Sequence, residues 1–327
     1  MNAHISKAHS IINCLLGMLL SSHVLAAVYE MPDSSDDLLG EIKTISSKYE
    51  DTFIDIGRTY NVGYEELKSA NPGIDPWLPG EGTSILLPTQ FVLPEGERRG
   101  IVVNVAEFRI YYYYTSGGVK YVKTAPASVG RMDWSTPLGR TNIVAKVRNP
   151  SWYPPESIRK EHAARGDALP KVVPPGPNNP LGAYALRLGL SSYLIHGTNR
   201  PEGLGMRVTH GCVRLLPEDI AWLFPQVDLK TPVSIINQPV KFGWRGDALY
   251  LEVHPALEKS DKNPASADMT LITREYVKVT GSKQAEVDWE LVAQVYREQL
   301  GIPVKVGMRV PVEAGGGVLS RNTDSSL

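Results

Sequence analysis

The stretch IHGTNRPEGLGMRVTHGCVRL, residues 195–215, constrains this chain more than any other. Its four glycines allow sharp turns and bring backbone N–H groups close to a ligand. The same stretch contains His196, His210 and Cys212. An imidazole within reach of a thiol can remove its proton, and the thiolate can then attack a carbonyl carbon. The pattern therefore indicates a glycine-rich loop that carries a nucleophilic cysteine.

The cysteine count supports a working thiol. The 327 residues include two cysteines, Cys14 and Cys212. Cys14 lies in an apolar run that small residues follow, a pattern typical of a cleaved export signal, so we expect residues 1–27 to be a signal peptide. The run is too short for a comfortable membrane span, and an uncleaved N-terminal anchor is the alternative. In an exported chain, a remaining lone cysteine is either a pairing site or a working thiol, and the nearby histidines favour the second.

Composition indicates a β-rich protein without a nucleic-acid partner. Lys and Arg number 34 against 35 Asp and Glu, so there is no basic excess. The 29 glycines and 25 prolines indicate many turns. Segments rich in Val, Ile and Tyr predict a mainly β domain at residues 99–238. The predicted strands are 101–105, 108–114, 119–125, 141–147, 184–188, 193–196 and 233–236.

Residues 45–89 are expected to form a small separate module. Asp51 and Thr52 can cap a helix at 53–60, and a second helix at 64–70 precedes a short strand. The order strand, helix, helix, strand resembles a LysM module. The residues that carry this resemblance include the turns Asn71-Pro72-Gly73 and Leu78-Pro79-Gly80. The resemblance implies glycan binding, and a structural spacer is the alternative.

The other regions are expected to be less regular. A proline-rich stretch at 149–180 predicts a long irregular loop that forms a lid or wall over the site. Proline followed by acidic residues predicts a helix at 217–224. Residues 28–43 read as a polar lead-in and 90–99 as a linker. The remaining expectations are a small α+β region at 239–313, with a strand at 249–253 and a helix at 287–300, and a disordered tail at 314–327.

The central stretch resembles the L,D-transpeptidases of the YkuD type, in the branch from Gram-negative envelopes. That family's pattern is a histidine, about fifteen residues, and then Ser/Thr-His-Gly-Cys. Here it stands as His196 followed by the run Thr209-His210-Gly211-Cys212-Val213-Arg214. The resemblance implies a β-sandwich-like catalytic domain, a location in the periplasm, and peptidoglycan stem peptides and glycan strands as partners. It implies no cofactor and no metal.

The resemblance also implies residue roles. Cys212 is the nucleophile and His196 the base, whose ring we expect the backbone of Gly197 to orient. Backbone N–H groups around Gly211, with the His210 side chain, would stabilise the oxyanion. Thr209, Gly197 and Arg214 are the expected substrate-binding residues. Arg214 would hold a substrate carboxylate, and a structural ion pair is the alternative.

The implied reaction is acyl transfer from a tetrapeptide stem, with release of D-alanine. The acceptor is expected to be the C-terminal lysine of an outer-membrane lipoprotein, or else the diaminopimelate of a second stem. Three rivals stay open. They are a cysteine peptidase or L,D-carboxypeptidase with water as acceptor, a zinc site made by His196, His210 and Cys212, and a non-catalytic wall-binding protein.

Overall fold

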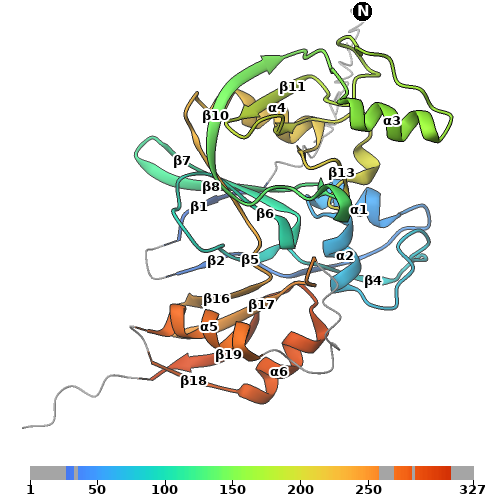
Figure 1. Cartoon of the computed structure of the whole chain (residues 1–327). Helices are drawn as coiled ribbons and strands as arrows, with labels where there is room; N and C mark the ends of the chain where they lie inside the picture. Colours follow the sequence, from blue (N-terminus) through green and yellow to red (C-terminus); the bar gives the residue numbers. More distant parts are fainter. Residues whose placement is uncertain (1–26, 33–35, 258–268, 282–283, 311–327) are drawn as a thin grey trace, which may run out of the picture.

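The computed structural model describes residues 27–32, 36–257, 269–281 and 284–310 (Figure 1). A large sheet lies in the upper part of the view, a small helical unit at its right, and the C-terminal region below. Nearly all of the expected signal peptide, and the whole expected tail at 314–327, lie outside the described residues. Across the described ranges no helix has the length and apolar character needed to cross a membrane.

The large sheet has nine strands and bends back on itself. β10 pairs with β15 through residues 139–142 and with β11 through residues 143–148, and its register shifts after Ile143. Such an irregularity bends a strand. Ile101 from one half and Leu186 from the other therefore share one core. In spatial order the strands are β1 (Val28–Glu30), β8 (Val119–Pro126), β7 (Arg109–Ser116), β6 (Gly100–Asn104), β15 (Pro232–Ile236), β10 (Gly139–Arg148), β11 (Tyr184–Leu188), β12 (Leu194–His196) and β14 (Val213–Arg214).

This arrangement refines the sequence-based expectation. The seven predicted strands are present, but the sandwich-like core comes from a single curled sheet rather than from two separate sheets. Local alternation identifies strands, whereas the bend at β10 depends on partners distant in sequence. The connecting elements are η1 (Val105–Glu107), β9 (Val129–Gly130), η2 (Met132–Trp134), α3 (Glu156–Ala164), η3 (Pro201–Gly203), β13 (Arg207–Thr209) and α4 (Pro217–Gln226).

Three regions that we expected to be irregular are ordered. The stretch 149–180 contains the helix α3, although it is otherwise the long loop that the prolines predicted. The lead-in at 28–43 supplies β1 and β2 (Leu38–Gly40), and the linker at 90–99 begins with β5 (Gln90–Val92), which pairs with β2. Leu39 and Phe91 are buried there in a shared cluster. These strands are too short to show a pattern of their own, so their order depends on the surfaces that they meet.

The helical unit has the expected order of elements. It consists of β3 (Lys43–Ser46), α1 (Phe53–Tyr60), α2 (Tyr64–Ala70) and β4 (Ser84–Leu87), with β3 antiparallel to β4. Thr52 and Asp55 form a reciprocal capping box that starts α1. Asn71 bonds the carbonyl oxygen of Leu67 and both backbone groups of Leu86, so it joins α2 to β4.

The C-terminal region packs two helices on a four-stranded sheet. Trp244, Ile272 and Val292 are buried in its core. The strand at 249–253 and the helix within 287–300 were predicted, whereas the helix α5 was not. The elements are β16 (Val240–Arg245), β17 (Ala248–Val253), α5 (Met269–Thr280), β18 (Ala285–Val287), α6 (Trp289–Glu298) and β19 (Val304–Arg309), in the sheet order β16-β17-β19-β18.

Candidate active site

Two short parallel strands bring the two ends of the central stretch together. On β12 and β14, Ile195 pairs with Val213 and His196 pairs with Arg214. Ile195 and Val213 point into the buried core. Since side chains alternate along a strand, His196 and Arg214 share the opposite face, and Cys212 continues that face two positions before Arg214. Neighbouring strands lie about 4.8 Å apart, so the imidazole, the thiol and the guanidinium gather at one place.

The ring of His196 is held in one tautomer. It is buried, and its Nδ1 lies 2.6 Å from the carbonyl oxygen of Gly197. A carbonyl oxygen only accepts hydrogen bonds, so Nδ1 carries the proton and Nε2 keeps its lone pair. Burial, and then the positive charge of Arg214, lower the pKa of His196 to about 4. The ring is therefore neutral at neutral pH, and the expected contact with Gly197 is present.

The thiol of Cys212 is protonated in this environment. Burial raises its pKa above the usual value, while a backbone hydrogen bond at Leu194 and the charge of Arg214 oppose that rise. Its Sγ–H points to the carbonyl oxygen of Ser192, with an Sγ···O distance of 3.8 Å. Because only the thiolate attacks well, Cys212 would act as a nucleophile only with the help of a base, and its thiol would have to turn from Ser192 toward that base.

A tight turn presents Cys212. Gly211 has φ +100°, and a Cβ added to it would lie 2.7 Å from the ring of Tyr193. The buried Thr209 closes the turn, since its hydroxyl donates to the carbonyl oxygen of Cys212 at 2.6 Å and accepts from the Gly211 N–H at 3.2 Å. We expected Thr209 to bind substrate, but these hydrogen bonds are internal to the turn. The second of these hydrogen bonds also uses the Gly211 N–H, which we expected to donate to the oxyanion.

Arg214 forms no ion pair with an acidic residue in the part of the chain that the structure describes. Its buried Nε has no hydrogen-bond partner there either. Burial, and then the charge of Arg200, lower its pKa. Buried charges are normally paired, so the guanidinium groups of Arg214 and Arg200, whose charges repel each other, suit an anionic ligand. The structural ion pair that was the alternative for Arg214 is not seen among these residues.

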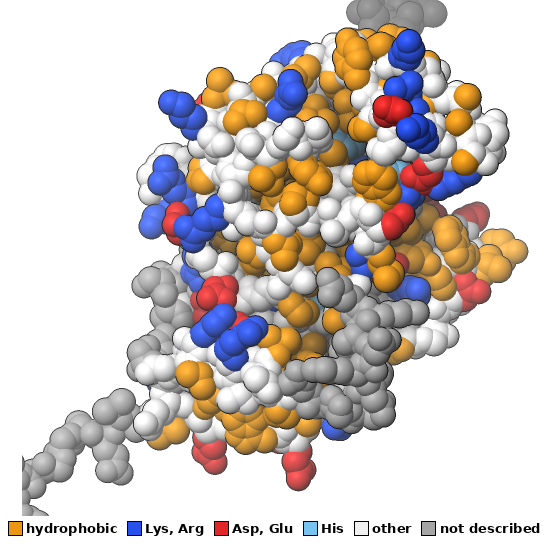
Figure 2. Space-filling view, in the orientation of Figure 1, with side chains coloured by type: hydrophobic (Ala, Val, Ile, Leu, Met, Phe, Trp, Pro, Cys, Tyr) orange, Lys and Arg blue, Asp and Glu red, His pale blue; other side chains and the backbone are white. Residues whose placement is uncertain are grey.

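His210 contacts a residue that sequence reasoning missed. Its Nε2 lies 2.9 Å from Oε2 of Glu161 on α3. The rings of Trp134 and His210 form an edge-to-face contact, with their centroids 5.3 Å apart. Figure 2 shows histidine side chains recessed in the upper part of this face, near basic and acidic side chains. The run of good helix formers at 156–164 was the available signal for α3. Nothing local linked that helix to His210.

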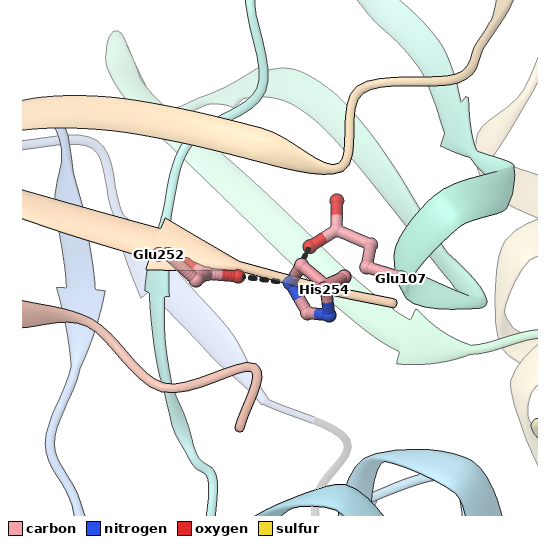
Figure 3. A group of neighbouring side chains, drawn as sticks. All are labelled: Glu107, Glu252 and His254. Carbon is pink, nitrogen blue, oxygen red and sulfur yellow. Dashed lines mark hydrogen bonds and ion pairs between the residues drawn. The ribbon is translucent and has the colours of Figure 1, made fainter. Parts of the chain in front are cut away.

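A second group of charged side chains lies away from this site. Glu107, Glu252 and His254 gather where the C-terminal region meets the large sheet (Figure 3), and His254 lies 2.6 Å from Glu252. They are the only described His, Cys, Asp or Glu side chains close enough together to hold a metal. However, Nζ of Lys241 already bonds Glu107 at 2.5 Å and Glu252 at 2.8 Å. The group is a buried ion-pair cluster, and the rival zinc site at Cys212 is not assembled.

Comparison with known proteins gives consistent matches. Residues 98–235 match the YkuD family, described as the L,D-transpeptidase catalytic domain. The chain is 37% identical over 304 residues to the probable L,D-transpeptidase ErfK/SrfK of Salmonella typhimurium LT2, covering 90% of this chain and 96% of that protein. It is 38% identical over 288 residues to the probable L,D-transpeptidase YcfS of Escherichia coli K12. This match covers 86% of this chain and 88% of that protein. The NMR structure of the catalytic domain from the E. faecium L,D-transpeptidase aligns with 44% of this chain and 100% of that one, at 22% identity and a TM-score of 0.33.

Proposed function

The chain belongs to the L,D-transpeptidase family, and from this premise we propose that it transfers the acyl group of a peptidoglycan tetrapeptide stem to an amine through a thioester on Cys212. The observation that carries the proposal is the parallel pairing of β12 with β14. This pairing joins the strand of His196 to the strand that begins directly after Cys212, although the two residues are 16 positions apart in the sequence, and it supports His196 as the base.

The first half of the reaction forms the thioester. Nε2 of His196 takes the proton from the Sγ of Cys212, and the thiolate attacks the carbonyl carbon between the L-centre of diaminopimelate and D-alanine. As the tetrahedral intermediate collapses, the C–N bond breaks and the His196 imidazolium gives its proton to the leaving amine. D-Alanine leaves, and the stem stays bound as a thioester. Base assistance of this kind contributes roughly 10²–10⁴-fold.

The second half transfers the acyl group. An amine attacks the thioester carbon and loses a proton to His196, an amide bond forms, and the C–S bond breaks. The sulfur then leaves as thiolate and takes the proton back from His196. The acceptor that we favour is the C-terminal lysine of an outer-membrane lipoprotein. Its alternatives are a diaminopimelate amine of a second stem, which gives a 3→3 cross-link, and water, which gives a carboxypeptidase.

In this proposal, two further groups bind the substrate or stabilise the tetrahedral intermediate. The backbone N–H of Cys212 is the remaining donor of its turn for the oxyanion, because Thr209 accepts the N–H of Gly211. Arg214, with Arg200 nearby and without a carboxylate partner among the described residues, would hold a carboxylate of the stem.

The proposal includes the helical unit and the location. The order β3-α1-α2-β4 and the turns at 71–73 and 78–80 support a LysM-like glycan-binding role for residues 45–89. Such a role would keep the site close to glycan strands. We also propose that the protein acts in the periplasm after removal of residues 1–27, because peptidoglycan stems are found there.

Product analysis tests the function. Purified wild-type protein and Cys212→Ala are incubated with disaccharide-tetrapeptide, with and without a peptide that ends in lysine, and products are identified by mass spectrometry. We expect the wild type to release D-alanine and form a lysine-linked or dimeric product, which identifies the acceptor. The variant should form neither.

A chemical control avoids any change of sequence. From residue 28 onward Cys212 is the only cysteine, so alkylation by iodoacetamide modifies a single thiol and should stop the reaction. A shortened tripeptide as the only product would favour the carboxypeptidase. Product formation by Cys212→Ala would reject the thioester.

A further inference from the structure

Glu161 lies at the centre of a charged network beside the candidate active site. It projects from α3, 49 positions from His210 in the sequence, yet its Oε2 is 2.9 Å from Nε2 of that histidine. The same oxygen accepts from Nη2 of Arg131 at 2.7 Å, and Oε1 accepts from Arg165. Arg131 is itself bonded to Asp133. Arg131, Arg165 and His210 therefore converge on one carboxylate.

The protonation state of Glu161 determines the state of its partner. Hydrogen bonds from Arg131 and then from His210 lower the pKa of Glu161 to about 2. At neutral pH the carboxylate is therefore ionised and can only accept hydrogen bonds. Nε2 of His210 must then carry a proton, and in the neutral ring Nδ1 keeps the lone pair.

We propose that Glu161 is a positioning residue for acyl transfer, which holds His210 with its proton on Nε2 and leaves Nδ1 for the reaction. The inference rests on the proposed function of Cys212. It gives α3 a role in the site, because the Glu161 carboxylate on this helix orients a ring two residues before Cys212.

The two histidines then present opposite nitrogen atoms. His196 donates from Nδ1 to Gly197 and keeps its lone pair on Nε2. His210 donates from Nε2 to Glu161, so Nδ1 is the nitrogen that holds the lone pair whenever this ring is neutral. When its ring is neutral, His210 therefore offers Nδ1 as an acceptor. This suits the N–H of an incoming amine, and it changes our expectation that His210 donates to the oxyanion.

The network also gives Arg131 a role in holding the Glu161 carboxylate. Without its ion pair, Glu161 would keep His210 and Arg165 as its partners among the described residues, and the side chain of Arg165 is exposed. Arg131 lies beside the turn that leads to Trp134, whose indole packs against the His210 ring. The ring is thereby held by Glu161 on one atom and by an aromatic side chain on its face.

Histidine ¹⁵N NMR of the full chain, combined with acyl-transfer kinetics, tests this inference. The variants are Glu161→Gln and Glu161→Ala, and the matched control is Glu156→Gln on the same helix, whose carboxylate forms an exposed pair with Lys160. The glutamine amide can donate as well as accept, so it no longer selects one tautomer.

We expect the wild type and the control to show His210 protonated on Nε2, and both Glu161 variants to show a mixture of tautomers. Loss of a charged hydrogen bond predicts that kcat falls roughly 10- to 100-fold in the Glu161 variants, with KM changing less. If Glu161→Ala does not fold, Glu161→Gln still gives the test.

An unchanged His210 tautomer in Glu161→Gln would overturn the inference, as would a kcat equal to that of the control. Failure of the proposed function gives a different result. In that case Cys212→Ala would keep its activity, while the tautomer measurement would be unaffected.

Discussion

At His196, burial determines both the catalytic state and a contribution to stability. The ring is 5% exposed and adjoins the guanidinium of Arg214, so protonation in the folded protein is unfavourable. A base must be unprotonated to act, and a pKa of about 4 keeps His196 ready over the whole neutral range.

This shift predicts a pH dependence of the free energy of unfolding. The pKa of His196 is about 4 in the folded chain against a usual value of 6.5, so between these values the unfolded state binds more protons. Stability attributable to His196 therefore rises from pH 4 to pH 6.5 and is constant above. The contribution of His196 to the free energy of unfolding changes by up to roughly 3 kcal/mol over this range.

Urea unfolding of wild type and His196→Gln across pH 4 to 7 measures the effect. The glutamine cannot titrate, so the wild-type curve should be steeper than that of the variant over the lower part of this range. Parallel curves would show that His196 has an ordinary pKa in the folded protein.

At the scale of elements, the turn between β13 and β14 holds Cys212, the proposed nucleophile. Its φ of +100° at Gly211 is unfavourable for any residue with a Cβ, and the ring of Tyr193 occupies the space that a Cβ would need. Thr209 braces the same turn from within. Position and orientation of Cys212 therefore depend on the glycine before it.

Gly211→Ala should lower acyl transfer by more than tenfold and reduce stability by about 1–3 kcal/mol, because strain and a clash both move Cys212. The control is Gly139→Ala, at φ +131° with no atoms within 4 Å of an added Cβ. It has the unfavourable φ without the clash. Transfer rates and urea unfolding compare the two, and equal transfer rates would contradict the role given to this turn.

At the scale of the whole molecule, buried ion pairs join the three parts. Glu66 of α2 bonds Arg109 of β7 at 2.7 and 2.8 Å, and these side chains are 5% and 0% exposed. Lys241 similarly connects β16 of the C-terminal region to Glu107 beside the large sheet. The helical unit and the C-terminal region are thus attached to the large sheet through charges that water does not reach.

Glu66→Ala should destabilise the protein by roughly 3–5 kcal/mol, because it leaves the Arg109 charge buried and unpaired. The exposed pair of Arg58 with Glu218 also joins the helical unit to the sheet domain, at 3.1 Å, and serves as control. Arg58→Ala should lower the free energy of unfolding by less than about 1 kcal/mol. Thermal or urea unfolding measures both, and similar losses would show that burial of the first pair is unimportant.

The sequence by itself determined the elements with strong local signals. The helices α1 and α2 and the strands β6, β7, β8 and β11 follow from caps, turns and β-branched or aromatic runs. The residues of the candidate chemistry were also visible, because His196, His210 and Cys212 lie in one glycine-rich stretch.

Only the tertiary structure decided which parts of the chain those elements contact. The bend of the sheet at β10, the pairing of β2 with β5, and the contact between Glu161 and His210 join residues far apart in sequence. A local pattern records the period of a strand or helix but not its partner. The tautomer of His196, the contact of His210 with Glu161 and the buried cluster around Lys241 all depend on such partners, because burial and neighbouring charge arise only when the chain has folded.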